Sequence, residues 1–208
     1  MARALVFSIV ILALLVIAPT SEEAVGAPAA GAAFEDNTPH LIVSVSPPTL
    51  PADGGSYSAV YIEIQTAKGL PLAAPQDITL TLTSSVLQVG SVDPSAQLSE
   101  GETYAVATFY TTLTPGSTNI TATAKGMKTA SVKVTTVSPS GSAVKLGVFA
   151  SPATLLPQVG STGKILVQLL DAGNRPARAP TIINVSLASS SPSVADVTPR
   201  IVIQKGQA

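Results

Sequence analysis

The stretch ITLTLT, residues 78–83, alternates apolar and hydroxyl-bearing residues. Because successive side chains of a β-strand point to opposite faces of a sheet, this period of two predicts a strand with one buried and one wet face. Pro and Gly interrupt the chain about every eight to twelve residues, a spacing typical of β-sandwiches. We therefore predict an all-β protein. The same alternation, with β-favouring Val, Ile, Thr and Tyr, occurs in VYIEIQ (60–65), NITATA (119–124) and SVKV (131–134).

The chain contains an internal repeat with an offset of 105 residues. Residues 39–103 align with residues 144–208 without a gap, and 20 of the 65 aligned positions are identical. The strand-ending turn in EIQTAKGLPLAAP (63–75) returns as QLLDAGNRPARAP (168–180). A repeat of this length is a whole domain rather than a solenoid unit. We predict the same turn in two tandem modules, with Gly and Asn accepting positive φ where the chain reverses.

The repeated units resemble bacterial Ig-like domains of the invasin and intimin type. Members of that family have a strand, a Pro-Gly turn and a T-x-T-A strand in succession, and a similar succession occurs here in GETYAVATFYTTLTPGSTNITATAKG (101–126). They also have a turn with Asp followed by Gly-Asn-x-Pro. This turn is matched by Asp171, Gly173, Asn174 and Pro176. The resemblance implies tandem Ig-like β-sandwiches that serve as stalk or adhesion units at a cell surface. An antibody-type domain is not indicated, because the chain has no Cys and no Trp.

The N-terminus has the layout of an export signal. Arg3 precedes an unbroken apolar stretch from Ala4 to Ala18, which is followed by small residues. We predict an N-terminal signal helix within a signal peptide at residues 1–27, with an uncleaved membrane anchor as the alternative. Either way, the rest of the chain is expected to be secreted or at the cell surface. Beyond it we predict a linker at 28–39, Ig-like module 1 at 40–137, a short linker at 138–143 and Ig-like module 2 at 144–208.

The net charge and the lack of cysteine limit which partners and metal sites are expected. The formal charge is −1 and the pI about 5.7, so there is no basic field to attract nucleic acid. Contact with a membrane is expected only through the N-terminal segment. With no cysteine, an exported chain must be held together without disulfides, and a thiolate zinc site is excluded.

Module 2 is shorter than module 1. Under the repeat, Ala208 corresponds to Thr103, so residues 104–137, which we expect to hold the last three strands of module 1, have no counterpart. About half a dozen inward side chains at ~1.5–3 kcal/mol each would be missing, on the order of 10 kcal/mol. This compares with a net stability of ~5–15 kcal/mol for a domain, so module 2 is not expected to fold alone. The missing strands would come from a longer surface protein, or from another subunit that donates them to an open edge.

We predict no enzymatic activity, no catalytic residue, no cofactor and no metal site. The single histidine, His40, is expected at the surface where the linker meets the first strand, and no Gly-x-Ser-x-Gly elbow is present. Calcium deserves consideration at Asp53-Gly54-Gly55 and at Asp171-x-Gly173-Asn174, but ordinary turn chemistry accounts for both.

Two N-glycosylation triplets occur, beginning at Asn119 and Asn184. Strand alternation turns Ile120 and Val185 inward and both asparagines to solvent, so these are our candidate modification sites.

The leading functional hypothesis is an exported cell-surface structural or adhesion protein whose tandem modules act as a stalk or scaffold. Its partners would be neighbouring Ig-like modules or subunits, or a cell-surface protein or glycan. Two alternatives remain: a carbohydrate- or partner-binding accessory module of a larger extracellular protein, and a subunit of a surface layer or filament.

Overall fold

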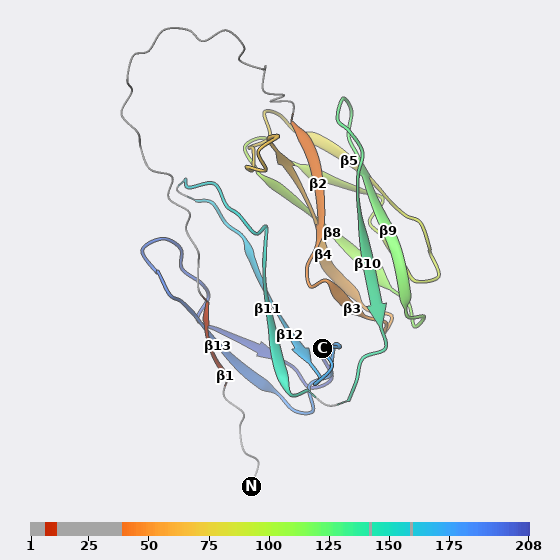
Figure 1. Cartoon of the computed structure of the whole chain (residues 1–208), viewed down its shortest axis with the longest axis vertical. Helices are drawn as coiled ribbons and strands as arrows, with labels where there is room; N and C mark the ends of the chain where they lie inside the picture. Colours follow the sequence, from red (N-terminus) through yellow and green to blue (C-terminus); the bar gives the residue numbers. More distant parts are fainter. Residues whose placement is uncertain (1–6, 12–38, 142, 159) are drawn as a thin grey trace, which may run out of the picture.

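The computed structural model describes residues 7–11, 39–141, 143–158 and 160–208 (Figure 1). Within these ranges the chain forms strands β1 to β14 and no helix. The predicted all-β fold is confirmed. Strands β2 to β10 form module 1 and strands β11 to β14 form most of module 2.

Module 1 is a sandwich of two sheets. The first has the order β2-β4-β8-β6 and the second β3-β10-β9-β5-β7. These orders contain the A-B-E-D and G-F-C arrangements of the Ig fold. All pairs are antiparallel except β3 with β10, which run parallel. The strands are β2 (His40–Val45), β3 (Thr49–Pro51), β4 (Ser56–Gln65), β5 (Ile78–Ser84), β6 (Gly90–Val92), β7 (Ser95–Leu98), β8 (Tyr104–Thr111), β9 (Gly116–Thr123) and β10 (Ala130–Val137).

The core of module 1 follows the alternation seen in the sequence. On β5, Leu80 and Leu82 are buried and the three threonines at 79, 81 and 83 are exposed. Residues 104–137 form β8, β9 and β10, the three strands expected there. The fully buried side chains contributed by both sheets include Leu50, Ile62, Phe109, Ile120 and Val134.

Module 2 repeats the first half of module 1. Strands β11 (Lys145–Ser151) and β12 (Lys164–Leu170) pair with each other, and β13 (Ile183–Ser189) pairs with β14 (Arg200–Ile203). Its core gathers Leu169, Ala179, Ile183, Val185, Leu187 and Ile203. No counterparts of β8, β9 and β10 occur among the described residues of module 2.

Equivalent backbone hydrogen bonds confirm that the repeat is structural. The turn after β4 is closed by Gly69 N–H donating to Thr66 O, and the turn after β12 by Asn174 N–H donating to Asp171 O, 105 residues later. Gly69 has φ +76° and its equivalent Asn174 has φ +63°. The positive φ predicted for this turn therefore falls on Gly in one copy and on Asn in the other. Gly173, also expected to need it, is not among the positive-φ residues.

The described part of the predicted signal segment is a strand. Residues Phe7–Ile11 form β1, which pairs in parallel with β13. At these five residues a strand replaces the predicted signal helix, because an open sheet edge offers backbone hydrogen bonds that an extended segment can use. The rest of residues 1–27, and the linker up to residue 38, lie outside the described residues.

The two modules lie side by side rather than end to end. Figure 1 shows β11 and β12 alongside the sheet that contains β2, β4 and β8, with the connection running from the end of β10. Module 2 thus folds back beside module 1, and a surface of each module faces the other.

Candidate functional site: the contact between the modules

Two buried polar side chains mark the contact between the modules. Glu63 on β4 and Gln168 on β12 are equivalent under the repeat, and they are only 5% and 4% exposed. Each alternates with core residues of its own module, so each lies on the face of its sheet directed away from that core. A polar residue on such a face is ordinarily exposed to solvent. Its burial requires contact with a part of the protein outside the sandwich.

Gln168 shows what that cover is. Its Nε2 donates a hydrogen bond to the carbonyl oxygen of Thr49 in module 1, at 3.0 Å. The outward face of the β11–β12 pair is therefore turned toward module 1. A buried amide paired in this way contributes about 0.5–1.5 kcal/mol, and a buried amide without a partner would be costly.

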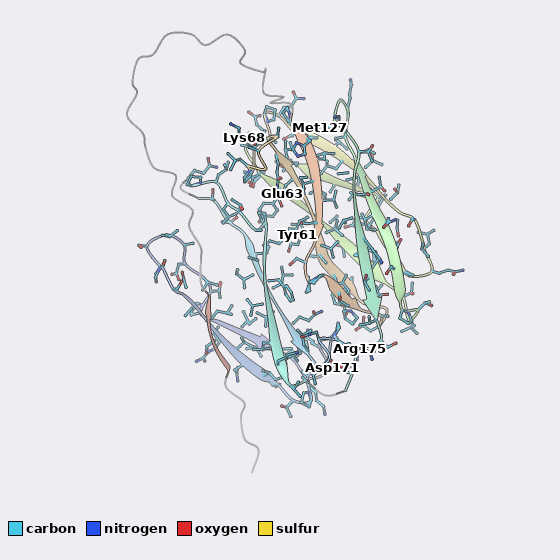
Figure 2. The ribbon with its side chains drawn as sticks, viewed as in Figure 1. Tyr61, Glu63, Lys68, Met127, Asp171 and Arg175 are labelled. Carbon is cyan, nitrogen blue, oxygen red and sulfur yellow. The ribbon has the colours of Figure 1, made fainter. Side chains whose placement is uncertain are left out.

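On module 1, Tyr61 and Glu63 form the corresponding outward patch of β4. Tyr61 is 1% exposed, although it lies outside the core cluster of module 1. Its ring lies 6.1 Å from that of Tyr104 on β8, and Figure 2 places Tyr61 and Glu63 on the side of module 1 nearest β11 and β12. The alternation of VYIEIQ predicts a wet face here. At these two positions that expectation is wrong, because the neighbouring module removes the face from water.

Glu63 is an unusual group for such a place. Burial raises the pKa of its carboxyl group, and the hydrogen bond from Gln65 Nε2, at 3.1 Å, only partly opposes this. Its negative charge is therefore disfavoured in the folded protein.

Asp53 joins the end of module 1 to module 2. Its Oδ1 accepts hydrogen bonds from Gly55 N–H at 3.0 Å and from the Tyr57 hydroxyl at 2.8 Å. Its Oδ2 forms an ion pair with Arg178 Nη2 of module 2 at 3.2 Å. The Asp53 side chain is only 12% exposed, so most of its surface is covered by these partners. Burial, followed by the hydrogen bond to Asp53, raises the pKa of Tyr57.

The linker is also tied to module 2. Ser140 N–H donates to Pro176 O at 2.8 Å, and Arg178 N–H donates to Ser140 O at 3.0 Å. Arg175 adds a bond from Nη2 to Ser138 O at 3.1 Å. The predicted linker thus pairs with the segment after the repeated turn, which limits the angles open to the two modules.

The carboxylates weighed for calcium are engaged in these turns. Asp171 Oδ1 accepts from Gly173 N–H at 2.8 Å and Arg175 N–H at 2.9 Å, and chiefly the Arg175 bond lowers the Asp171 pKa. Asp53 is held as described above. Among the described residues no group of three or more His, Cys, Asp or Glu side chains is placed to hold a metal ion. Both acidic turns therefore stabilise backbone reversals.

A groove of about 690 Å³ is lined by the first residues of β2 and by the segment that leads into β10. His40, the first residue of β2, is half-buried and lines the groove together with the exposed Lys128. The other lining residues include Pro39, Leu41, Ala67, Gly126 and Ser131. The groove presents apolar side chains together with one imidazole and one ammonium group.

The two candidate glycosylation asparagines lie on separate sheets. Asn119 on β9 and Asn184 on β13 are both exposed, while Ile120 and Val185 beside them are fully buried. The alternation therefore predicts their orientation correctly.

Sequence reasoning missed Gln168, Arg178 and the buried Glu63. For Glu63 and Gln168 the available signal was that polar residues stand at the same position of both repeats, whereas the repeat equivalent of Arg178 is Ala73.

Among the described residues, no helix has the length and apolar character needed to cross a membrane.

Comparison with known proteins gives weak likenesses. No protein-family model and no curated protein matches the chain. Among solved structures, domains 5–6 of the S-layer protein SbsC match with 16% identity and a TM-score of 0.45, covering 82% of this chain and 86% of that one. Invasin, a bacterial integrin-binding protein, matches with 20% identity and a TM-score of 0.31, covering 71% and 28%.

A glycosyl hydrolase family 2 member from Bacteroides cellulosilyticus matches with 14% identity and a TM-score of 0.40, covering 47% of this chain. The chain spans only 14% of that enzyme's length. With every one of these TM-scores below 0.5, none of the likenesses bears on what this chain does.

Proposed function

We propose that this chain is an exported cell-surface protein whose two Ig-like modules form a structural unit, a stalk or scaffold, of the invasin and intimin type. The observation that carries the proposal is the pairing of an early strand of module 1 with its last strand. β3, near the start of the module, runs parallel to β10, its last strand, with Thr49, Leu50 and Pro51 in register with Thr135, Thr136 and Val137.

Parallel pairing of an early and a final strand has a mechanical consequence. A load applied between the two ends of module 1 pulls β3 and β10 in opposite directions along their lengths. The interstrand bonds are then loaded together in shear rather than one after another. The bond from Ala52 N–H to Val137 O, at 2.7 Å, lies at the end of the same pair.

The contact between the modules supports the same role. Gln168 to Thr49, Arg178 to Asp53 and Ser140 to Pro176 connect the two modules and their linker at separate points. Such contacts hold neighbouring units at a defined angle, as a scaffold requires.

Force spectroscopy on the chain between two marker domains tests the mechanical role. We expect module 1 to unfold as one event at a force well above that of a helical marker domain. The opposite result, unfolding of module 1 at forces no higher than the helical marker, would remove the argument from β3 and β10.

Export needs its own test. We expect immunogold labelling of intact cells to detect the modules at the surface, and N-terminal sequencing of that material to show whether residues 1–27 have been removed. Intact-mass measurement on the same material reports whether Asn119 and Asn184 carry glycans. Labelling only after the cells are broken would contradict the surface location.

The groove beside β2 favours one second candidate, a carbohydrate- or partner-binding accessory module. Its volume is in the range of small-ligand sites, and His40 and Lys128 supply polar groups beside apolar side chains. A glycan array with the unaltered chain and with a His40→Ala, Lys128→Ala double variant separates the two candidates. Binding that the double variant loses favours an accessory module, and a flat response favours the scaffold.

A further inference from the structure

The outer edge of β13 is occupied in this structure by a strand from the far N-terminus. β13 pairs with β14 on one side and with β1 on the other. In module 1 the equivalent strand, β5, pairs with β7 and β9. Because β14 stands at the repeat position of β7, β1 takes the place that β9 takes in module 1.

The register of β1 matches this replacement residue by residue. In module 1, Leu82 pairs with Ala122 and Ser84 with Ile120, both buried residues of β9. At the equivalent positions of module 2, Leu187 pairs with Ile9 and Ser189 with Ile11. Apolar residues of β1 therefore stand in register where β9 contributes its core residues, although β1 runs parallel to β13 and β9 runs antiparallel to β5.

The sequence of β1 suits this edge. In FSIVI (7–11) the apolar residues at 7, 9 and 11 are in register with Val185, Leu187 and Ser189, and Ser8 is in register with Ser186. Val185 and Leu187 are 0% and 5% exposed. A slip of one residue would put Ser8 opposite a core position, so one register is favoured.

We propose that the edge of β13 is a strand-acceptor site and that its occupant is the N-terminal segment Phe7–Ile11 of the same chain. An uncovered β13 edge would present unpaired N–H and C=O groups and invite pairing with other chains. The N-terminal segment supplies the missing backbone partners along β13. Removal of residues 1–27 would then expose this edge. The proposal does not depend on the surface role proposed above.

Engineered disulfides test the pairing directly, because the chain has no cysteine of its own. Two in-register pairs, Ser8→Cys with Ser186→Cys and Val10→Cys with Ala188→Cys, use the less buried positions of β13. Two crossed pairs, Ser8→Cys with Ala188→Cys and Val10→Cys with Ser186→Cys, are the matched controls. In a crossed pair, the two residues are offset by two positions along neighbouring strands that are ~4.8 Å apart. Their Cα atoms are therefore about 8 Å apart, which exceeds the ~7 Å limit for a disulfide.

Mild oxidation of the full-length variants, followed by non-reducing gel electrophoresis, gives the readout. We expect both in-register pairs to form a faster-migrating monomer that reverts on reduction, and both crossed pairs to form little of it. A ladder of disulfide-linked oligomers would show that the strand comes from a second copy and overturn the proposal. Equal oxidation of in-register and crossed pairs, or oxidation of neither, would overturn it as well.

Thermal unfolding provides a second readout that does not depend on disulfide geometry. Ile9→Asp places a charge in register with buried Leu187, whereas Val10→Asp is in register with exposed Ala188. We expect Ile9→Asp to lower the midpoint of the module 2 transition by about 4 °C or more relative to Val10→Asp. Equal midpoints for the two variants would contradict a strand held in this register.

Discussion

Arg178 of module 2 and Asp53 of module 1 form an ion pair, with Nη2 and Oδ2 3.2 Å apart. The guanidinium side chain is 45% exposed, so solvent weakens the pair. Arg178 also donates from Nη1 to Gly206 O within its own module. A single substitution at Arg178 therefore reports more than the contact between the modules.

A double-mutant cycle isolates this ion pair. We expect Asp53→Asn and Arg178→Met to show a coupling free energy of about 0.2–1 kcal/mol in urea unfolding, because the pair is partly exposed. Arg200→Met, which removes an exposed arginine of β14, serves as the control and should show no coupling with Asp53→Asn. Strictly additive effects of the first pair would mean that the contact adds nothing to stability.

The second prediction concerns pH and Glu63. Burial raises the folded-state pKa of Glu63 above its ordinary value of 4.5, so the folded state binds this proton more tightly than the unfolded state. The stability contributed by the protonated group is present below pH 4.5 and is lost as the pH rises through the folded pKa.

Replacing Glu63 by Gln removes the titration while keeping the shape. We expect Glu63→Gln to be more stable than the unaltered chain at pH 7, and the difference to shrink as the pH approaches 4. Denaturant unfolding between pH 4 and 8 measures this, with exposed Glu100→Gln as the control. A Glu63→Gln variant that is less stable at neutral pH would contradict the unfavourable charge.

The third prediction concerns the packing of Gly90 in β6. A Cβ atom at this position would lie 2.4 Å from Phe109 Cζ and 2.6 Å from Tyr110 O, closer than atoms can approach. Gly90→Ala is expected to destabilise module 1 by about 1–3 kcal/mol through overpacking. Gly141→Ala, whose Cβ meets nothing within 4 Å, should change the free energy of unfolding little. Similar losses for the two variants would contradict the packing around Phe109.

The fourth prediction concerns the repeated turn. Asn174 has φ +63°, a conformation that disfavours a β-branched side chain. We expect Asn174→Val to cost about 1–2 kcal/mol and Asn174→Gly to be tolerated. Ala172→Val, in the same turn, is the control. Thermal unfolding of the three variants measures the ranking, and an Asn174→Val variant as stable as Ala172→Val would be inconsistent with the left-handed backbone.

Local patterns predict the parts of this fold that depend on local physics. The alternation at 78–83 identifies Leu80 and Leu82 as core, and the repeat identifies the turn that brings Gly69 and Asn174 to positive φ. The same alternation fails at Tyr61 and Glu63, because their burial depends on a second module whose position no local period records. The pairing of β1 with β13 was missed for a related reason. An apolar run preceded by Arg3 resembles an export signal whether or not it also finds a sheet edge.

Because the modules pack side by side, the molecule would become longer if they separated and moved into line. Tension would first part Gln168 from Thr49 and Arg178 from Asp53, contacts that lie between the sandwiches rather than within them. Swinging the modules into line would lengthen the molecule while the β3–β10 pair stayed closed. In the proposed scaffold role, each unit would therefore lengthen under load before either sandwich opened.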